Sequence, residues 1–164
     1  MGDGIYPWCG CFNDLASGDQ RSVAQLVASG NAVRGSTDDL LARLKRTRCV
    51  ALLREEGTDR IVGGAAWKQP AADYRRATFI NAGTLISGFE AAPELGYVVI
   101  ATDMQGKQLS GGLVTAITDK ITEPTFATTD SNTMRKNLER SGFIRVGGEW
   151  QGKKGMLSLW TMTP

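Results

Sequence analysis

Apolar residues recur at helical spacing near the start of the chain. Residues Asp19–Ser29 carry three apolar side chains at steps of three and four, and Gly30 follows as a stop signal. A second short helix with leucines on one face is expected after Ser36 or Thr37, since either residue can cap a helix. The pattern therefore predicts two early helices.

Strand-like apolar runs come next. Cys49–Leu53 and Ile61–Trp67 are separated by the polar turn Glu56–Asp59, which predicts a β-hairpin. The segment Lys68–Pro93 has the weakest pattern, with one helical turn expected around Asp73–Thr78.

Strands and helices alternate in the second half. Tyr97–Ala101 is a continuous apolar run, typical of a central strand buried on both faces. A polar loop follows, and a helix begins near Leu109. Thr125–Thr128 is then a short strand, and the last helix starts with Ser131 or Asn132 as its cap.

The end of the last helix has its own signature. If Gly142 takes the left-handed conformation just past the helix, Phe143 and Leu138 make the apolar contact of a Schellman motif. Two strands, Ile144–Val146 and Met156–Met162, complete the chain. The order of elements predicts an α+β fold, a mixed sheet with helices on both faces.

Length and charge narrow the class of protein. A chain of 164 residues suits one domain spanning 1–164. A net charge of only +2 gives no general attraction to nucleic acid or to a membrane surface. No apolar stretch approaches the ~20 residues that span a bilayer, and the N-terminus does not resemble a signal peptide. We expect a cytoplasmic protein with no membrane or nucleic-acid partner.

The chain contains no histidine, which excludes every mechanism that needs an imidazole base. The three cysteines are Cys9, Cys11 and Cys49. Their number is odd, and no second pair completes a metal site with the C-x-C. Free thiols and no metal are expected.

The segment ELGYVVIATDMQGKQLSGGL, Glu94 to Leu113, carries the clearest chemistry. A buried strand ends, a loop of small residues turns, and a helix starts at once. The first amides of a helix have no internal partners and lie at the positive end of its dipole, so this junction can bind a phosphate group. Gly106 and Gly111 keep side chains away, and Lys107 adds a charge at the rim.

Three known sites share this strand–loop–helix plan. A nucleotide P-loop requires G-x-x-x-x-G-K-[ST], and a dinucleotide fold requires G-x-G-x-x-G early in a βαβ unit. Neither spacing is present in this loop. The pyrophosphate loop of acyl-CoA transferases remains.

The segment resembles motif A of the GNAT superfamily of N-acetyltransferases, whose loop reads Q/R-x-x-G-x-G/A. Gln105 stands at the Q/R position, whereas Gln108 and Ser110 stand where small residues are usual. NTMRKNLERSGF, Asn132–Phe143, resembles motif B, and the order of elements is similar over nearly the whole chain. The resemblance implies a GNAT-type, mostly antiparallel, twisted sheet.

The resemblance also implies a site for acetyl-CoA as co-substrate. The strand before the loop would pair through its backbone with the pantetheine arm, the loop would bind the pyrophosphate, and Asn132 would face the cofactor. The alternative for the strand is a plain core strand, the alternative for the loop is a solvated turn, and the alternative for Asn132 is a helix cap. The predicted cofactor-binding residues are Val98, Val99, Ile100, Gln105, Gly106, Lys107, Gln108, Leu109, Ser110, Gly111 and Asn132.

Glu94 is the predicted catalytic residue. It stands eleven residues before Gln105, where some GNAT enzymes carry a general-base glutamate; the alternative is a solvated strand end. Many relatives take their general acid from a tyrosine four residues before the motif B glycine, but Leu138 occupies that position here. Tyr74, Tyr97, a serine or water remain as donors, or the thiolate leaves unaided.

The leading function is therefore acetyl transfer from acetyl-CoA to a primary amine of a small molecule or peptide, by direct attack in a ternary complex. A non-catalytic acyl-CoA-binding module stays open because Gln108, Ser110 and Leu138 depart from the family pattern. A toxin-like acetyltransferase of aminoacyl-tRNA stays open as well, although the low net charge argues against it.

Two further features bear on partners. The basic cluster Arg43, Lys45, Arg46 and Arg48 is expected to be the solvated end of the second helix. The resemblance implies that the early helices line the acceptor groove, so an anionic acceptor or tRNA is the alternative, and Tyr74, Arg75 and Arg76 could border the same groove. A homodimer through the C-terminal strands is compatible with the apolar run Met156–Met162.

Overall fold

The computed structural model describes residues 4–30 and 35–164. Within these ranges, seven strands form one sheet in the order β1-β2-β3-β4-β5-β7-β6. Neighbouring strands are antiparallel except β4 and β5, which are parallel. The predicted α+β class, with a mixed and mostly antiparallel sheet, is confirmed. No helix in the described ranges is both long and apolar enough to cross a membrane.

The strands and helices have these bounds: β1 Ile5–Gly10, α1 Ser17–Ser29, α2 Thr37–Leu44, β2 Cys49–Glu55, β3 Ile61–Lys68, α3 Ala72–Ala82, β4 Glu94–Ile100, α4 Leu109–Thr118, β5 Thr125–Thr129, α5 Asn132–Arg140, β6 Ile144–Gln151 and β7 Met156–Met162. Short 3-10 turns, η1 (Phe12–Asp14) and η2 (Thr102–Met104), precede α1 and follow β4.

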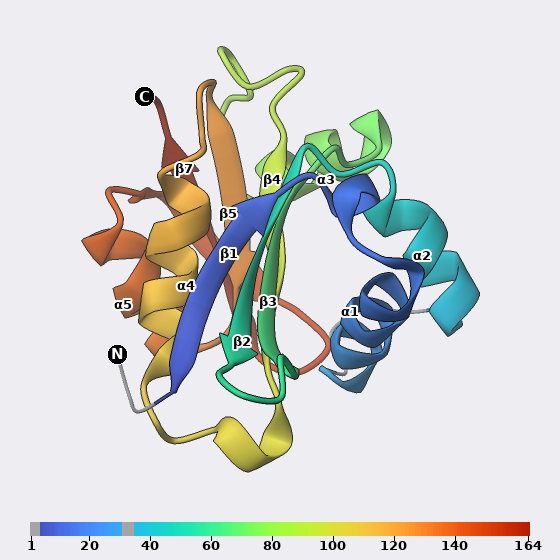
Figure 1. Ribbon diagram of the computed structural model, residues 1–164. Helices are drawn as coiled ribbons and strands as arrows, with labels where there is room; N and C mark the ends of the chain where they lie inside the picture. The colour runs from blue at the N-terminus through green and yellow to red at the C-terminus, as the bar shows by residue number, and fades with distance from the viewer. Residues whose placement is uncertain (1–3, 31–34) are drawn as a thin grey trace.

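Helices cover both faces of the sheet (Figure 1), as the sequence predicted. In β2, Leu52 packs in the cluster under α1 and α2, whereas its neighbour Leu53 packs in the cluster under α4. This split follows from the alternation of side chains along a strand. On the α1 face, Phe79 of α3 packs edge-on against Phe126 of β5, with ring centroids 5.6 Å apart.

Strand β1 is an element that the sequence pattern missed. It pairs antiparallel with β2, with Ile5 opposite Glu55 and Gly10 opposite Val50. Pro7 lies within it, which is tolerated because β1 is an edge strand and loses no ladder hydrogen bond on its outer side. Proline and glycine hide the apolar alternation that would have indicated a strand.

The predicted end of the last helix is confirmed. Gly142 has φ +98°, Phe143 N–H donates to the Leu138 carbonyl at 2.9 Å, and Gly142 N–H donates to the Glu139 carbonyl at 3.1 Å. These two bonds are the Schellman pair. Ser131 is the N-cap, because its hydroxyl accepts from Met134 N–H at 3.2 Å.

Replacing Gly142 by alanine is expected to lower the free energy of unfolding by about 1–2 kcal/mol, since a Cβ is strained in the left-handed region. The matched control is Gly148→Ala, where the φ is ordinary and an added Cβ meets open space. Urea unfolding of both variants checks this. Equal losses for the two alanines would show that the left-handed position is not the cause.

Candidate functional site

Strand β4 organises the site, because it parts from β5 soon after it starts. The two parallel strands pair at Glu94 and Phe126. Beyond that point, among the described residues, the β5-facing backbone edge of Val98, Val99 and Ile100 has no strand partner. This edge could pair with an extended ligand in the manner of an added strand.

The loop after β4 leads directly into the N-terminus of α4. The Gln105 side chain donates to the carbonyl of Ile100 at 3.2 Å, which closes the end of the strand. Gly106 has φ +81°, and an added Cβ there would meet open space. No side chain caps α4, and its first turn contains no acidic residue. The first amides of α4 are thus free to bind an anion.

Gln108 stands at the N-cap of α4 with φ +60°. This is the motif position at which the resembled family has glycine, and the left-handed backbone gives the physical reason for that preference. A left-handed conformation is uncommon for a residue with a side chain, and such strain gathers at ligand sites. The exposed Gln108 side chain also stands where a phosphate would approach the amides.

We expect Gln108→Gly to tighten acetyl-CoA binding by about three- to tenfold, because it removes an exposed side chain from the approach to the amides, and about 1 kcal/mol is roughly fivefold in Kd. The control is Gln105→Gly, at an extended φ of −70°, which should weaken binding by removing the bond to Ile100. Calorimetry with acetyl-CoA measures both. Weaker binding by the Gln108 variant would contradict this account of the loop.

Asn137 supports the loop from α5, a role that sequence reasoning missed. Its buried amide donates to the Ser110 hydroxyl at 3.0 Å. A Cβ at Gly111 would lie 3.2 Å from the Asn137 oxygen, so glycine allows the two helices to approach. Asn132, the predicted cofactor-facing residue, is exposed at the first position of α5. The polar, buried Asn137 inside motif B was the available signal.

Two other predicted loop residues are also placed. Lys107 is exposed and its ammonium lies 3.9 Å from the Met104 sulfur. Leu109 is buried at the start of α4. Leu109 therefore anchors the helix in the core through its side chain, and only its backbone amide can face a ligand.

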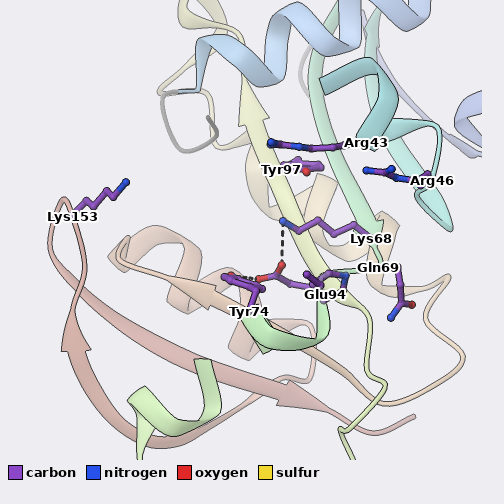
Figure 2. A pocket seen from close by; sticks show the side chains of 10 residues that line it. Arg43, Arg46, Lys68, Gln69, Tyr74, Glu94, Tyr97 and Lys153 are labelled. Atoms are coloured by element: carbon purple, nitrogen blue, oxygen red, sulfur yellow. Dashed lines mark hydrogen bonds and ion pairs between the residues drawn. The ribbon is translucent and has the colours of Figure 1, made fainter. Parts of the chain in front are cut away.

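A cavity of about 720 Å³ lies at the other end of β4 (Figure 2). This volume falls within the range of about 300–1,000 Å³ that is usual for small-molecule sites. The lining residues are Arg43, Arg46, Lys68, Gln69, Pro70, Ala71, Tyr74, Glu94, Tyr97 and Lys153.

Glu94 is the buried acid of this cavity, only 3% exposed, so the alternative of a solvated strand end is wrong. Lys68 Nζ lies 3.1 Å from Oε1 in an ion pair. The Tyr74 hydroxyl donates to Oε2 at 2.8 Å. Oε1 accepts no hydrogen bond of good geometry from the described residues. One oxygen of a buried carboxylate is therefore available to a further donor.

Tyr74 reaches the cavity from α3, and 45% of the residue is exposed. Burial of the hydroxyl, the charge of Glu94 and the hydrogen bond to it all raise the pKa of Tyr74 well above its usual value. The phenol therefore stays protonated at neutral pH and acts as a donor to Glu94. A raised pKa also makes it a poor general acid.

Lys68 is a second residue that sequence reasoning missed. It pairs with Glu94 across β3 and β4. An added Cβ at Gly96 would lie 2.7 Å from Lys68 Cε, so glycine lets the lysine cross the strand. Its ammonium lies 4.2 Å from the ring centroid of Tyr97, which has φ +54° in a β4 irregularity. A strained backbone beside a buried ion pair is typical of a ligand site.

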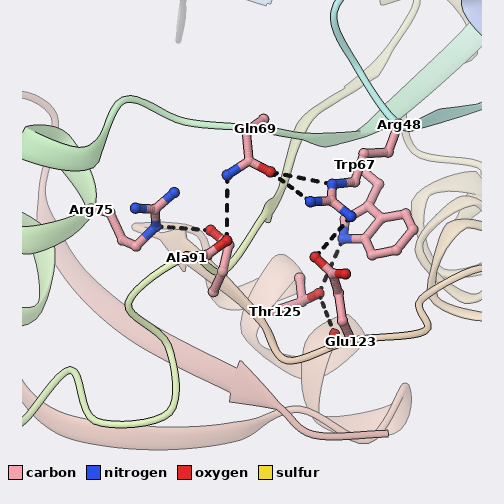
Figure 3. Close-up of polar contacts among 8 residues, drawn as sticks. Arg48, Trp67, Gln69, Arg75, Ala91, Glu123 and Thr125 are labelled. Carbon is pink, nitrogen blue, oxygen red and sulfur yellow. Dashed lines mark hydrogen bonds and ion pairs between the residues drawn. The ribbon is translucent and has the colours of Figure 1, made fainter.

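A polar network at the end of β3 includes one residue of the cavity lining, Gln69 (Figure 3). Arg48 donates twice to the Gln69 side chain, at 3.2 and 2.9 Å, and forms an ion pair with Glu123 at 2.8 Å. Trp67 donates to the Thr125 hydroxyl at 3.0 Å. The contacts tie the end of β3 to the start of β5, and so hold Lys68 in register with β4.

Several solved structures share this fold. An acyl-CoA N-acyltransferase from Pseudomonas aeruginosa aligns with a TM-score of 0.68 and 12% identity, over 97% of this chain and 99% of that one. A GNAT-family acetyltransferase from Bacillus cereus aligns at 0.63 and 12%, over 96% and 97%. Salmonella typhimurium yncA, with its cofactor acetyl-CoA, aligns at 0.65 and 16%, over 98% and 94%.

No family model matches the sequence, and no curated protein matches it. The likeness is therefore one of fold. This chain has the fold of the GNAT acetyltransferases, which confirms the fold that the sequence motifs implied.

Proposed function

We propose that the protein is an acetyl-CoA-dependent N-acetyltransferase acting on a primary amine by direct attack in a ternary complex. One observation carries the proposal. A single strand, β4, joins a buried carboxylate in a cavity, Glu94, to an uncapped helix N-terminus at Gln108. The two ends of the strand thereby combine a base for the acceptor with an anion site for the cofactor.

The residues present fit an acyl-CoA. The amides of Gly106 to Gly111 would hold the pyrophosphate, and the free edge of Val98, Val99 and Ile100 would hold the pantetheine arm. Lys107 would add charge at the rim, and Asn132 would approach the cofactor from α5. Bound acetyl-CoA supplies a thioester whose carbonyl carbon is open to attack by an amine.

Glu94 would accept the proton that the amine must lose, directly or through water, on Oε1, which is paired with the Lys68 ammonium but accepts no hydrogen bond of good geometry from the described residues. Tyr74 and Lys68 hold the carboxylate in place from two sides. Leu138, at the usual tyrosine position of motif B, is fully buried in the core and donates nothing. The thiolate would leave without a protein acid, since a thiol pKa of about 8.5 makes it a tolerable leaving group.

The test combines calorimetry with acetyl-CoA and release of free thiol in the presence of a panel of amines. Binding with amine-dependent thiol release supports the proposal. Binding without release from any amine indicates the non-catalytic module instead. Transfer to aminoacyl-tRNA alone, with steep salt dependence, indicates the toxin-like activity. No binding up to millimolar acetyl-CoA would overturn the proposal.

A further inference from the structure

We infer that the amine acceptor carries an anionic group, a carboxylate or a phosphate. This inference rests on the proposed function and names the substrate class of the same cavity. Cations outnumber acids on the cavity wall. The cations are Arg43, Arg46, Lys68 and Lys153, and the acid is Glu94.

The excess of positive charge lies away from Glu94. Lys68 is 3.1 Å from Glu94, so these two charges largely cancel. The remaining cations enter from two other segments: Arg43 and Arg46 from the last turn of α2 and just after it, and Lys153 from the turn between β6 and β7 (Figure 2).

Arg46 and Lys153 carry the inference. Within the described residues, neither forms an ion pair, and both side chains are exposed at the mouth of the cavity. Figure 2 shows them on opposite sides of the cavity, so an anionic group that enters it is attracted from both sides. An acceptor of this kind would place its amine at the Glu94 carboxylate and its anionic group near the exposed cations of the cavity.

The charge distribution favours a small acceptor over a polyanion. The whole chain has a net charge of only +2, so the positive potential is local to the cavity. Nucleic-acid binders neutralise many phosphates and need a broad basic surface. A small molecule with one anionic group needs only this local positive potential.

Two matched pairs of acceptors test the inference with wild-type protein. Phosphoethanolamine is compared with ethanolamine, and β-alanine with its amide. We expect kcat/KM to be about tenfold higher for the anionic member of one pair. Contacts between its anionic group and partly exposed cations account for a difference of this size. The preferred pair identifies phosphate or carboxylate. The anionic group by itself would lower the rate, because a nearby anion raises the amine pKa and lowers the free-amine fraction. A preference for the anionic amine therefore comes from the protein.

The double variant Arg46→Gln with Lys153→Gln should reduce this preference to about twofold or less, with the larger loss in kcat/KM falling on the anionic amine. The control, Lys45→Gln with Lys154→Gln, removes two charges from the same two segments outside the cavity lining, and should keep the preference. Added salt should weaken the preference in the wild type and leave the Arg46/Lys153 variant unaffected. A neutral amine preferred by the wild type, or equal loss in both double variants, would overturn the inference.

Binding separates this inference from the proposed function. In the presence of CoA, calorimetry compares the wild type with phosphoethanolamine, ethanolamine, β-alanine and its amide. Selective binding of an anionic amine that is never acetylated would support the inference and count against the transferase. Acetylation of neutral amines with no selective binding of either anionic amine would support the transferase and defeat the inference.

Discussion

Replacing Glu94 by glutamine is expected to lower kcat about 100-fold at neutral pH, and by at least about tenfold, with the Kd for acetyl-CoA unchanged. Glutamine has nearly the same shape and its oxygen can still accept from Tyr74 at the position of Oε2. It cannot accept the proton of a protonated amine. The loss should therefore fall on the chemical step and leave the cofactor loop at the far end of β4 untouched.

The pH profile separates a base from a merely structural carboxylate. An alkylamine has a pKa near about 10.4, so solvent supplies more free amine as the pH rises. The deficit of the Glu94 variant should shrink toward that pH. Tyr74→Phe is the control, because it removes the donor to Glu94 and keeps the base, and we expect a loss of only a few-fold. Equal rates for the Glu94 variant and wild type would remove Glu94 from the mechanism.

Local signals predicted much of the fold. The Schellman ending at Gly142 and the hairpin turn at Glu56–Asp59 both depend on residues close in sequence. The local sequence is therefore enough to predict them. The strand–loop–helix junction also lies within one short segment. The capping box, in which Ser36 and Asp39 bond each other's backbone, is equally local and confirms the predicted start of α2.

The cavity depends on contacts between distant segments, and the sequence indicated only part of its lining, namely Arg43, Arg46 and Tyr74 beside an acceptor groove. Lys68 meets Glu94 only because β3 and β4 pair in one register, and Lys153 comes from the β6–β7 turn. The α3 region was the least defined part of the prediction. Its helix extends over Ala72–Ala82, since the packing of Phe79 on the sheet stabilises more turns than the local pattern indicates.

Arg75 shows how far a charged residue can depart from a surface prediction. The sequence placed it with Tyr74 and Arg76 beside the acceptor groove, but it is only 4% exposed. Its guanidinium donates to the carbonyls of Ala92 at 2.9 Å and Glu90 at 2.8 Å (Figure 3 shows its setting). A third, longer bond of 3.4 Å reaches the Pro70 carbonyl. Arg75 thus ties the chain on both sides of α3 and fixes the approach to Glu94.

Arg75→Met is expected to lower the free energy of unfolding by about 3–4 kcal/mol, because the methionine keeps the stem but leaves the carbonyl of buried Ala92 and that of Glu90 without their donor. Arg76→Met is the matched control. Arg76 is the next residue, its side chain is 63% exposed, and its exposed pair with Asp73 should contribute less than about 1 kcal/mol. Urea unfolding measures both, and kcat should also fall in the Arg75 variant as Tyr74 and Glu94 lose their support. A loss below about 1 kcal/mol for Arg75→Met would show that water replaces the guanidinium, and that the α3–β4 connection is held by its apolar packing alone.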